Sequence, residues 1–273
     1  MLQLFCAPAP GLTVYITSTA YLSCISMKKL LNVIRVIYCL YALLWFIILM
    51  FVVLVFALVF TLFGKVRGGN LVYIACKGWA MAWYFVTGVR HKEIYEAPHD
   101  KTLQYIFVAN HISYMDIPCI VRSVHQRVRI LGKYEMVKYP VFGLIYRMVV
   151  VLVDRSSPER RAQSVRALKG ALKRHISIFI FPEGTFNETG NPLKSFYDGA
   201  FRIAIETQTP IKPMLFIDTL KRMHYKNIWQ LTPGICRTVY LEEISVEGYT
   251  MQDLPALKQK VYTAMEQGLL RWQ

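Results

Sequence analysis

Residues Leu103–Asp116 read LQYIFVANHISYMD, an apolar run that passes through a polar turn into a second apolar segment. The run Tyr105–Val108 predicts a buried strand, and residues 114–124 predict a helix. His111 lies between the two. We therefore expect it at the edge of a sheet, where α/β proteins place their chemistry.

His111 and Asp116 are five positions apart. In an ideal helix this spacing turns the two side chains away from each other, so they meet only if His111 precedes the helix. Ser113-Tyr114-Met115-Asp116 matches a capping box and predicts Ser113 as the N-cap, with Asp116 pointing back toward His111. A carboxylate there would fix one imidazole tautomer and leave the other nitrogen as a base. The alternative is that Asp116 only caps the helix and His111 is a surface histidine.

The composition indicates a membrane-associated protein with anionic partners. The hydrophobic fraction is 55%, which is high for a soluble protein. The chain has 32 Lys and Arg against 17 Asp and Glu, a formal charge of +15, which suits a phospholipid surface or phosphorylated small molecules. The sequence has no zinc-finger spacing or RNP-like motif, and its six cysteines lack CxxC spacing, so we expect neither a nucleic-acid partner nor a metal.

Residues 1–26 contain no Lys, Arg, Asp or Glu and so lack the basic start of a secretory signal. Met27-Lys28-Lys29 stands just before a long apolar run and resembles a natural start. We therefore expect residues 1–26 to be an upstream extension or a poorly ordered tail.

Residues 27–88 predict a membrane anchor made of two apolar helices. The charge-free run Val36–Gly64 exceeds the roughly 20 residues that cross a bilayer. Residues Lys65–Gly69 predict a turn, and the second run, Leu71–Gly88, carries tryptophans typical of the membrane interface. The second helix either crosses the bilayer, lies in its interface, or packs against the following domain.

Residues 89–273 predict one α/β domain, with a mostly parallel sheet flanked by helices, because short apolar strands alternate with helices. The expected strands are Leu103–Ala109, Val128–Leu131, Val149–Val153, Ser177–Phe181, Ile211–Phe216 and Thr238–Leu241. The expected helices are Ser113–Val124, Pro158–His175, Gly199–Thr207 and Pro255–Trp272.

Three further blocks carry candidate functional residues. The strand that starts at Met148 ends in Asp154-Arg155, and an arginine fork suits a phosphate. The strand from Ile178 runs into Pro182-Glu183-Gly184-Thr185, where Gly184 permits a tight turn and Glu183 and Thr185 suit hydroxyl groups. Two prolines open the strand at Thr209–Pro213. Taken singly, these blocks are more typical of a surface ion pair, an ordinary turn and the start of an edge strand.

Taken in order, the blocks resemble the glycerolipid acyltransferase family, whose best-known members are the 1-acyl-sn-glycerol-3-phosphate acyltransferases. The resemblance rests on Asn110-His111-x4-Asp116, the strand ending at Arg155, Phe181-Pro182-Glu183-Gly184-Thr185, and Pro210-x-x-Pro213. Segments Gly132–Glu135 and Pro140–Gly143, and an N-terminal hydrophobic anchor, are also similar to that family.

The resemblance implies that His111 is the general base and that Asp116 orients it. It also implies that Arg155, Glu183, Gly184 and Thr185 bind a glycerol-phosphate acceptor. The acyl donor would be acyl-CoA or acyl carrier protein, with no metal and no cofactor. This chemistry needs no acyl-enzyme, and the sequence has no Gly-x-Ser-x-Gly elbow.

One position departs from the family pattern. Many members place Arg after the Glu-Gly-Thr block, and this chain has Phe186 there. Lys133 and Lys194 are candidate substitutes for the missing cation.

The helix expected from Pro158 carries a basic face. Ser157 suits the N-cap and Pro158 the first helical position. Beside a membrane anchor, a basic face suits anionic headgroups or an acidic acyl carrier protein; otherwise it is simply solvated. The face comprises Arg160, Arg161, Arg166, Lys169, Lys173 and Arg174.

The sequence thus predicts a membrane-bound acyltransferase that acylates lysophosphatidate to phosphatidate. The alternatives are acylation of another lysolipid, such as a lyso-aminolipid, and a non-catalytic lipid-binding membrane protein. We expect the catalytic domain on the cytoplasmic face of a bacterial inner membrane, with the endoplasmic reticulum as the alternative.

Overall fold

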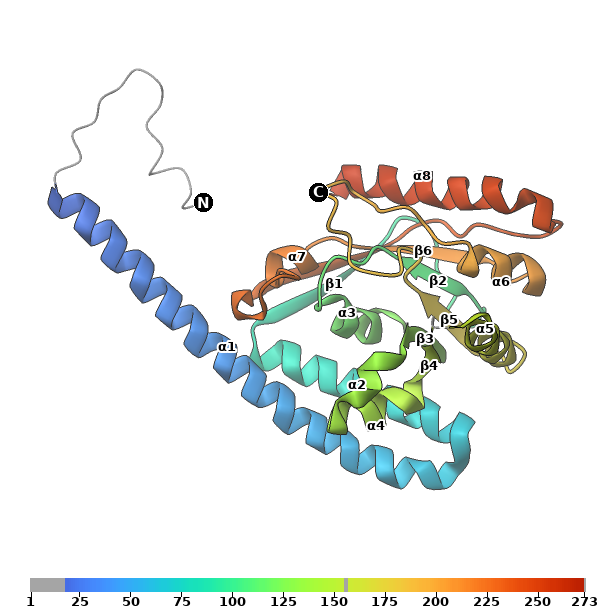
Figure 1. The fold of residues 1–273 in the computed structure, drawn as a ribbon, viewed down its shortest axis with the longest axis horizontal. Helices are drawn as coiled ribbons and strands as arrows, with labels where there is room; N and C mark the ends of the chain where they lie inside the picture. Colours follow the sequence, from blue (N-terminus) through green and yellow to red (C-terminus); the bar gives the residue numbers. More distant parts are fainter. Residues whose placement is uncertain (1–17, 155–156, 273) are drawn as a thin grey trace, which may run out of the picture.

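The expected strands assemble into one seven-stranded sheet of order β1-β7-β6-β2-β5-β3-β4, seen in a computed structural model that describes residues 18–154 and 157–272 (Figure 1). Neighbouring strands pair in parallel except β6 and β7, which are antiparallel. The mostly parallel α/β fold is therefore confirmed. The strands are β1 (Val89–Tyr95), β2 (Ile106–Ala109), β3 (Val128–Lys133), β4 (Val150–Val153), β5 (Ser177–Ile180), β6 (Ile211–Phe216) and β7 (Gly234–Tyr240).

Strand β1 is the one strand of the described chain that the sequence did not predict. It lies at the edge of the sheet beside β7, and only its first residue, Val89, is fully buried. Its sequence, VRHKEIY, therefore contains no continuous apolar run. Strands β2, β5 and β6 are buried along their whole length, so their sequences are nearly continuous apolar runs that predict strands.

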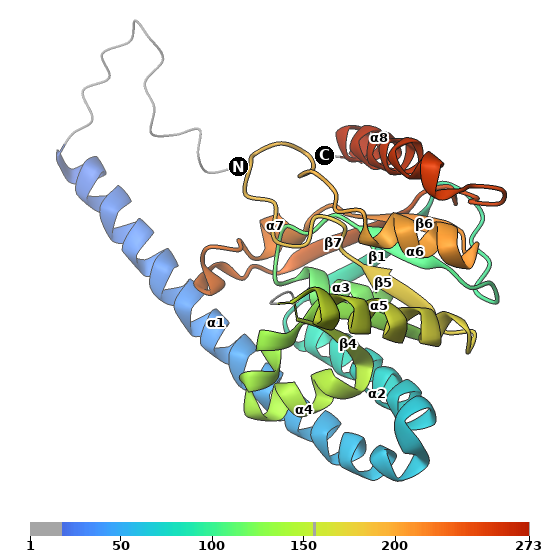
Figure 2. The same cartoon turned by 45° about the vertical axis from the view of Figure 1, so that its right-hand side comes forward.

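Helices cover both faces of the sheet (Figure 2). Helices α2 (Gly64–Val86), α3 (Asp116–Ser123) and α4 (Pro140–Val149) lie on one face, and α5 (Pro158–Leu172), α6 (Gly199–Thr207) and α8 (Leu254–Trp272) lie on the other. Strand β2 separates the two cores, because Phe107 joins the first and Ile106 and Val108 join the second. A short helix α7 (Thr219–Arg222) follows β6.

The N-terminal helices α1 (Ser18–Phe60) and α2 pack against each other as a hairpin (Figure 1). The turn lies at Thr61–Gly64, and Gly64 adopts a left-handed φ of 75°. The turn expected at Lys65–Gly69 is therefore wrong. Gly68 and Gly69 lie inside α2, where they allow neighbouring backbone to pack closely. A Cβ on Gly68 would lie 2.3 Å from the Phe60 carbonyl oxygen, and one on Gly69 would lie 2.7 Å from the Met148 carbonyl oxygen.

Helix α1 exposes a long apolar surface. Leu30, Ile37, Leu44, Phe51 and Val55 are each at least 50% exposed. Within the described residues, one helical segment, Lys29–Val86, is long and apolar enough to cross a membrane. Such a surface marks a membrane or partner contact.

Candidate active site

The turns that follow β2 and β5 meet at one edge of the sheet. The two strands are parallel neighbours, with Val108 opposite Ile180, so their carboxyl ends lie side by side. Asn110, buried at the end of β2, accepts a hydrogen bond from the Phe216 amide (2.8 Å) and donates one to the Phe216 carbonyl (3.0 Å). Asn110 therefore fixes the path of the chain into His111, a role that sequence reasoning missed. The signal was an amide side chain directly after a buried strand.

His111 and Asp116 are in direct contact. The Nδ1 atom of His111 lies 2.8 Å from the Oδ2 atom of Asp116, whose side chain is completely buried. The same oxygen accepts hydrogen bonds from the Ile112 and Ser113 amides at 2.8 and 2.9 Å. Because a carboxylate only accepts, Nδ1 carries a proton and donates a hydrogen bond to Asp116. The Nε2 atom of His111 is thereby left to act as a base.

Ser113 is not the N-cap of α3, contrary to the sequence prediction, but Asp116 does point back to His111 as predicted. Helix α3 begins at Asp116 with Met115 at the N-cap, and no side chain caps it. The Ser113 hydroxyl instead donates to the Met223 carbonyl (2.6 Å) and accepts from the Met115 amide (3.0 Å). The tight turn before α3, and not a capping box, brings the Asp116 carboxylate back to His111.

Aromatic rings enclose the imidazole of His111. The Phe181 ring stacks on it at a centroid distance of 3.9 Å and an angle of 10°, and the Phe186 ring lies 4.4 Å away. Tyr114 packs edge-on against Phe186 at 4.9 Å. The His111 side chain is 16% exposed, so one edge of the ring remains accessible.

Glu183 is fully buried and ties the two turns together. Its Oε1 accepts from the His111 amide and its Oε2 from the Lys194 amide, both at 2.9 Å. Burial raises the pKa of Glu183 to about 7, while the two amide bonds pull it down and the negative charge of Asp116 raises it. Both carboxylate oxygens thus face the backbone.

Gly184, Thr185 and Lys194 complete the second turn. Gly184 has a left-handed φ of 72°, which favours glycine. The Lys194 ammonium donates to the Thr185 hydroxyl at 2.8 Å, which places a cation in the turn beside His111. The Asn187 amide donates to the His111 carbonyl at 2.7 Å and closes the turn.

One predicted site residue within the described part of the chain, Lys133, does not join this cluster. Lys133 is exposed at the carboxyl end of β3, on the same side of the sheet but next to β4. Arg155 lies outside the described residues.

An apolar pocket of about 410 Å³ lies beside the His111 turn. It extends from Tyr114 and Met115 to helices α1 and α2, where Phe46, Trp79 and Trp83 line it. Tyr114 borders both the pocket and the Phe186 ring. The pocket therefore connects the edge of the site to the apolar hairpin.

A family model described as Acyltransferase matches residues 88–217. A 1-acyl-sn-glycerol-3-phosphate acyltransferase of Cocos nucifera is 28% identical over 189 residues, which are 68% of this chain and 59% of the relative. The protein of that name from Haemophilus influenzae is 29% identical over 163 residues, 59% of this chain and 66% of the relative. The chain thus spans slightly less than two thirds of the length of these curated relatives.

A solved structure gives the same result for the fold. The crystal structure of the 1-acyl-sn-glycerophosphate (LPA) acyltransferase, PlsC, from Thermotoga maritima superposes with a TM-score of 0.65 at 25% identity, covering 87% of this chain and 97% of that one. Together with the family match, this likeness confirms the resemblance expected from the motifs. Residues 88–217 of this chain are thus similar to the acyltransferase family, in sequence and in fold.

Proposed function

We propose that this chain is a membrane-bound O-acyltransferase that moves an acyl group from a thioester to the free hydroxyl of lysophosphatidate, giving phosphatidate. The observation that carries the proposal is the 2.8 Å contact between His111 and the buried Asp116, which leaves Nε2 of His111 as a base at the sheet edge. Relatives named for this reaction support the same acceptor class.

The reaction needs one proton carrier. Nε2 of His111 takes the proton of the acceptor hydroxyl while the hydroxyl oxygen attacks the thioester carbonyl carbon. When the tetrahedral intermediate collapses, the carbon–sulfur bond breaks and the imidazolium returns the proton to the thiolate. Asp116 stabilises the imidazolium in between.

A covalent cysteine intermediate does not fit the geometry. Cys119 is fully buried in α3, and its sulfur lies 3.1 Å from the Tyr84 hydroxyl. Burial raises the pKa of the Cys119 thiol well above its usual value, which disfavours the nucleophilic thiolate. Direct attack by the acceptor hydroxyl is therefore the favoured route.

The acceptor-binding group comprises Arg155, Glu183, Gly184, Thr185, Lys133 and Lys194. Within it, Thr185 and Lys194 offer a hydroxyl and a cation beside His111, which suits a glycerol phosphate. Glu183 contributes by accepting hydrogen bonds from the backbone amides of His111 and Lys194, which holds the two turns together. The role of Arg155 rests on the motif resemblance, and that of Lys133 on its charge and its position in the chain.

A second acceptor is favoured by one observation. Phe186 stands where many members have Arg, and its ring lies against His111 and Tyr114. An apolar wall there tolerates a lysolipid whose headgroup carries less negative charge. Another lysolipid, such as a lyso-aminolipid, is therefore the alternative acceptor.

The membrane assignment rests on the hairpin. Residues 27–88 form the proposed anchor and residues 89–273 the catalytic domain, and the exposed apolar surface of α1 suits bilayer contact. The apolar pocket beside Tyr114 suits an acyl chain that enters from that side. We place the domain on the cytoplasmic face, where thioester donors occur; a bacterial inner membrane stays a prediction.

An acceptor panel tests the proposal. The purified full chain in mixed micelles is given labelled acyl-CoA or acyl carrier protein and, in turn, lysophosphatidate, a lyso-aminolipid and lysophosphatidylcholine. We expect the highest kcat/KM for lysophosphatidate and a loss of about 10³-fold or more in His111→Ala. Turnover by the wild type no faster than by His111→Ala with every acceptor would favour the non-catalytic alternative.

A further inference from the structure

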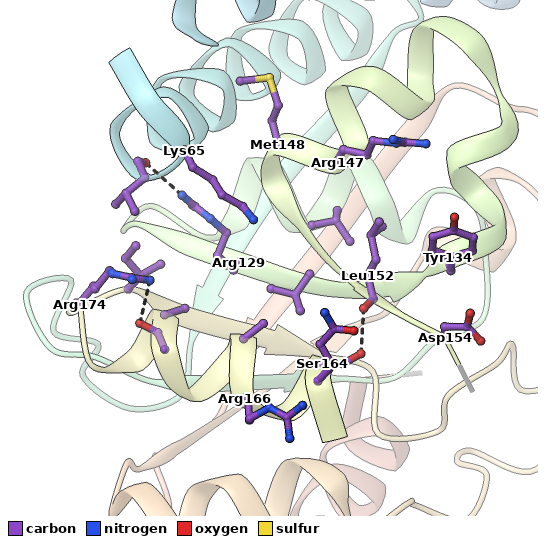
Figure 3. A pocket seen from close by; sticks show the side chains of 18 of the residues that line it. Lys65, Arg129, Tyr134, Arg147, Met148, Leu152, Asp154, Ser164, Arg166 and Arg174 are labelled. Atoms are coloured by element: carbon purple, nitrogen blue, oxygen red, sulfur yellow. Dashed lines mark hydrogen bonds between the residues drawn. The ribbon is translucent and has the colours of Figure 1, made fainter. Parts of the chain in front are cut away.

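A basic groove of about 1050 Å³ runs along β4, which forms the edge of the sheet opposite β1 (Figure 3). Helix α5 forms one wall, and the end of α4 and the start of α2 form the other. None of His111, Asp116, Glu183 or Lys194 lines it. Its basic side chains are Lys65, Arg129, Arg147, Arg160, Arg166 and Arg174.

The positive charges of the groove are poorly neutralised. Among the described residues that line it, Asp154 is the one acidic side chain, and it pairs with Arg160. On the rest of α5, Lys169 pairs with Glu206 across to α6. Of the basic face expected from the sequence, only Arg160, Arg166 and Arg174 line the groove.

Among these cations, Arg129 is buried, with a relative exposure of only 8%. It donates to the Asn70 side chain and to the Val66 and Val128 carbonyls, all neutral partners. Gly69 makes room for it, since a Cβ there would lie 2.8 Å from a guanidinium nitrogen. A buried charge with only neutral partners is costly, and an anion in the groove would supply its counter-charge.

The groove begins at the apolar hairpin. Lys65 and Val66, which line it, directly follow the α1–α2 turn, where Leu62 is 84% and Phe63 is 56% exposed. Between its basic walls the groove has apolar residues, including Leu152 and Ile176. The hairpin end of the groove thus combines exposed apolar residues, Leu62 and Phe63, with the cations of Lys65 and Arg129.

We propose that this groove binds the phosphate headgroup of an anionic membrane lipid, at a site separate from the catalytic centre. Arginine forks suit phosphate oxygens, and the acyl chains of such a lipid follow the exposed apolar residues of the hairpin turn. A bound lipid of this kind fixes the orientation of the domain on the membrane.

The other anionic ligands suit the groove less well. The basic side chains lie around a concavity that also has apolar lining residues, a shape that admits a lipid headgroup more readily than the surface of a folded protein such as acyl carrier protein. A nucleotide base needs aromatic stacking, and Tyr134 is the one aromatic ring among the described residues of the lining.

The test measures lipid binding without turnover. The purified full chain in a non-ionic detergent is titrated by calorimetry with dioctanoyl phosphatidylglycerol or dioctanoyl phosphatidylcholine, with no acyl donor present. We expect saturable binding of phosphatidylglycerol that is about tenfold weaker in the double variant Arg166→Gln/Arg174→Gln and further weakened by Arg147→Gln, with little binding of phosphatidylcholine.

The control variant is Lys173→Gln/Arg202→Gln, which removes the same formal charge from two exposed positions outside the groove, the C-cap of α5 and a residue of α6. It should stay within about twofold of the wild type, because only local contacts have changed. Equal weakening in both double variants, or tighter binding of adenosine 3′,5′-diphosphate that displaces the lipid, would overturn the proposal. Neither result bears on acyl transfer, which the acceptor panel measures separately.

Discussion

The turn after β2 and the turn after β5 lie side by side, and each contains a fully buried carboxylate. Asp116 directs one oxygen to the His111 ring and to two amides of its own turn. Glu183 directs its two oxygens to amides of separate segments, those of His111 and Lys194. The same chemical group therefore prepares a base in one turn and joins two loops in the other.

Removing the charge of Asp116 should have the largest effect. In Asp116→Asn the amide no longer stabilises an imidazolium at His111, so we expect kcat to fall about 10³-fold while KM changes little. Steady-state assays on lysophosphatidate check this, with circular dichroism to confirm folding. A kcat above one tenth of the wild-type value would remove Asp116 from the proposed mechanism.

The raised pKa of Glu183 predicts a pH-dependent stability. Between its ordinary pKa of 4.5 and about 7, the folded chain holds a proton that the unfolded chain has lost, so stability falls as pH rises through that window. Relative to Glu183→Gln, the free energy of unfolding should fall on the order of 3 kcal/mol from pH 4.5 to pH 7.5. Denaturant titrations across this range measure it; a pH-independent difference would contradict the raised pKa.

At a fixed pH of 6, Glu183→Gln should lower the free energy of unfolding by about 2 kcal/mol, because its NH₂ group cannot accept one of the two backbone N–H groups. Thermal unfolding in detergent measures the change. Glu188→Gln, an exposed change in the same loop, is the matched control and should be neutral. Equal effects of the two substitutions would show that Glu183 does not join the turns.

The smallest effect concerns Lys194, whose ammonium bonds Thr185 in the second turn. Lys194→Met should raise KM for lysophosphatidate about fivefold, since one charge-assisted contact is lost, and should leave kcat nearly unchanged. Lys173→Met is the control for loss of an exposed charge. An unchanged KM would leave this turn with a purely structural role.

The fold was predictable where sequence signals are local. Strands β2, β5 and β6 are continuous apolar runs because both of their faces are buried. Helix α4 was missed, and so was β1, whose exposed positions interrupt its apolar pattern. Gly68 and Gly69 suggested a turn because sequence does not distinguish a glycine that bends the chain from one that admits a neighbour.

In the site, too, local contacts were predictable from the sequence and contacts between distant segments were not. The contact between His111 and Asp116 was predictable because both residues belong to one short turn. The bonds of Glu183 were not, since their donors are backbone amides, one of them 72 positions away, and amides leave no mark in a sequence. Lys194 was named on charge alone, and its contact with Thr185 depends on the path of the loop.

The stacking of Phe181 on His111 constrains the order of proton movements. With one face of the imidazole covered at 3.9 Å, Phe186 packed close by and Nδ1 held by Asp116, the ring has no room to rotate. In the proposed reaction, the acceptor oxygen and the departing sulfur must then approach the same nitrogen from the same open side. Donor and acceptor are therefore expected to occupy the site together, so that steady-state kinetics should follow a ternary-complex pattern and not a ping-pong one.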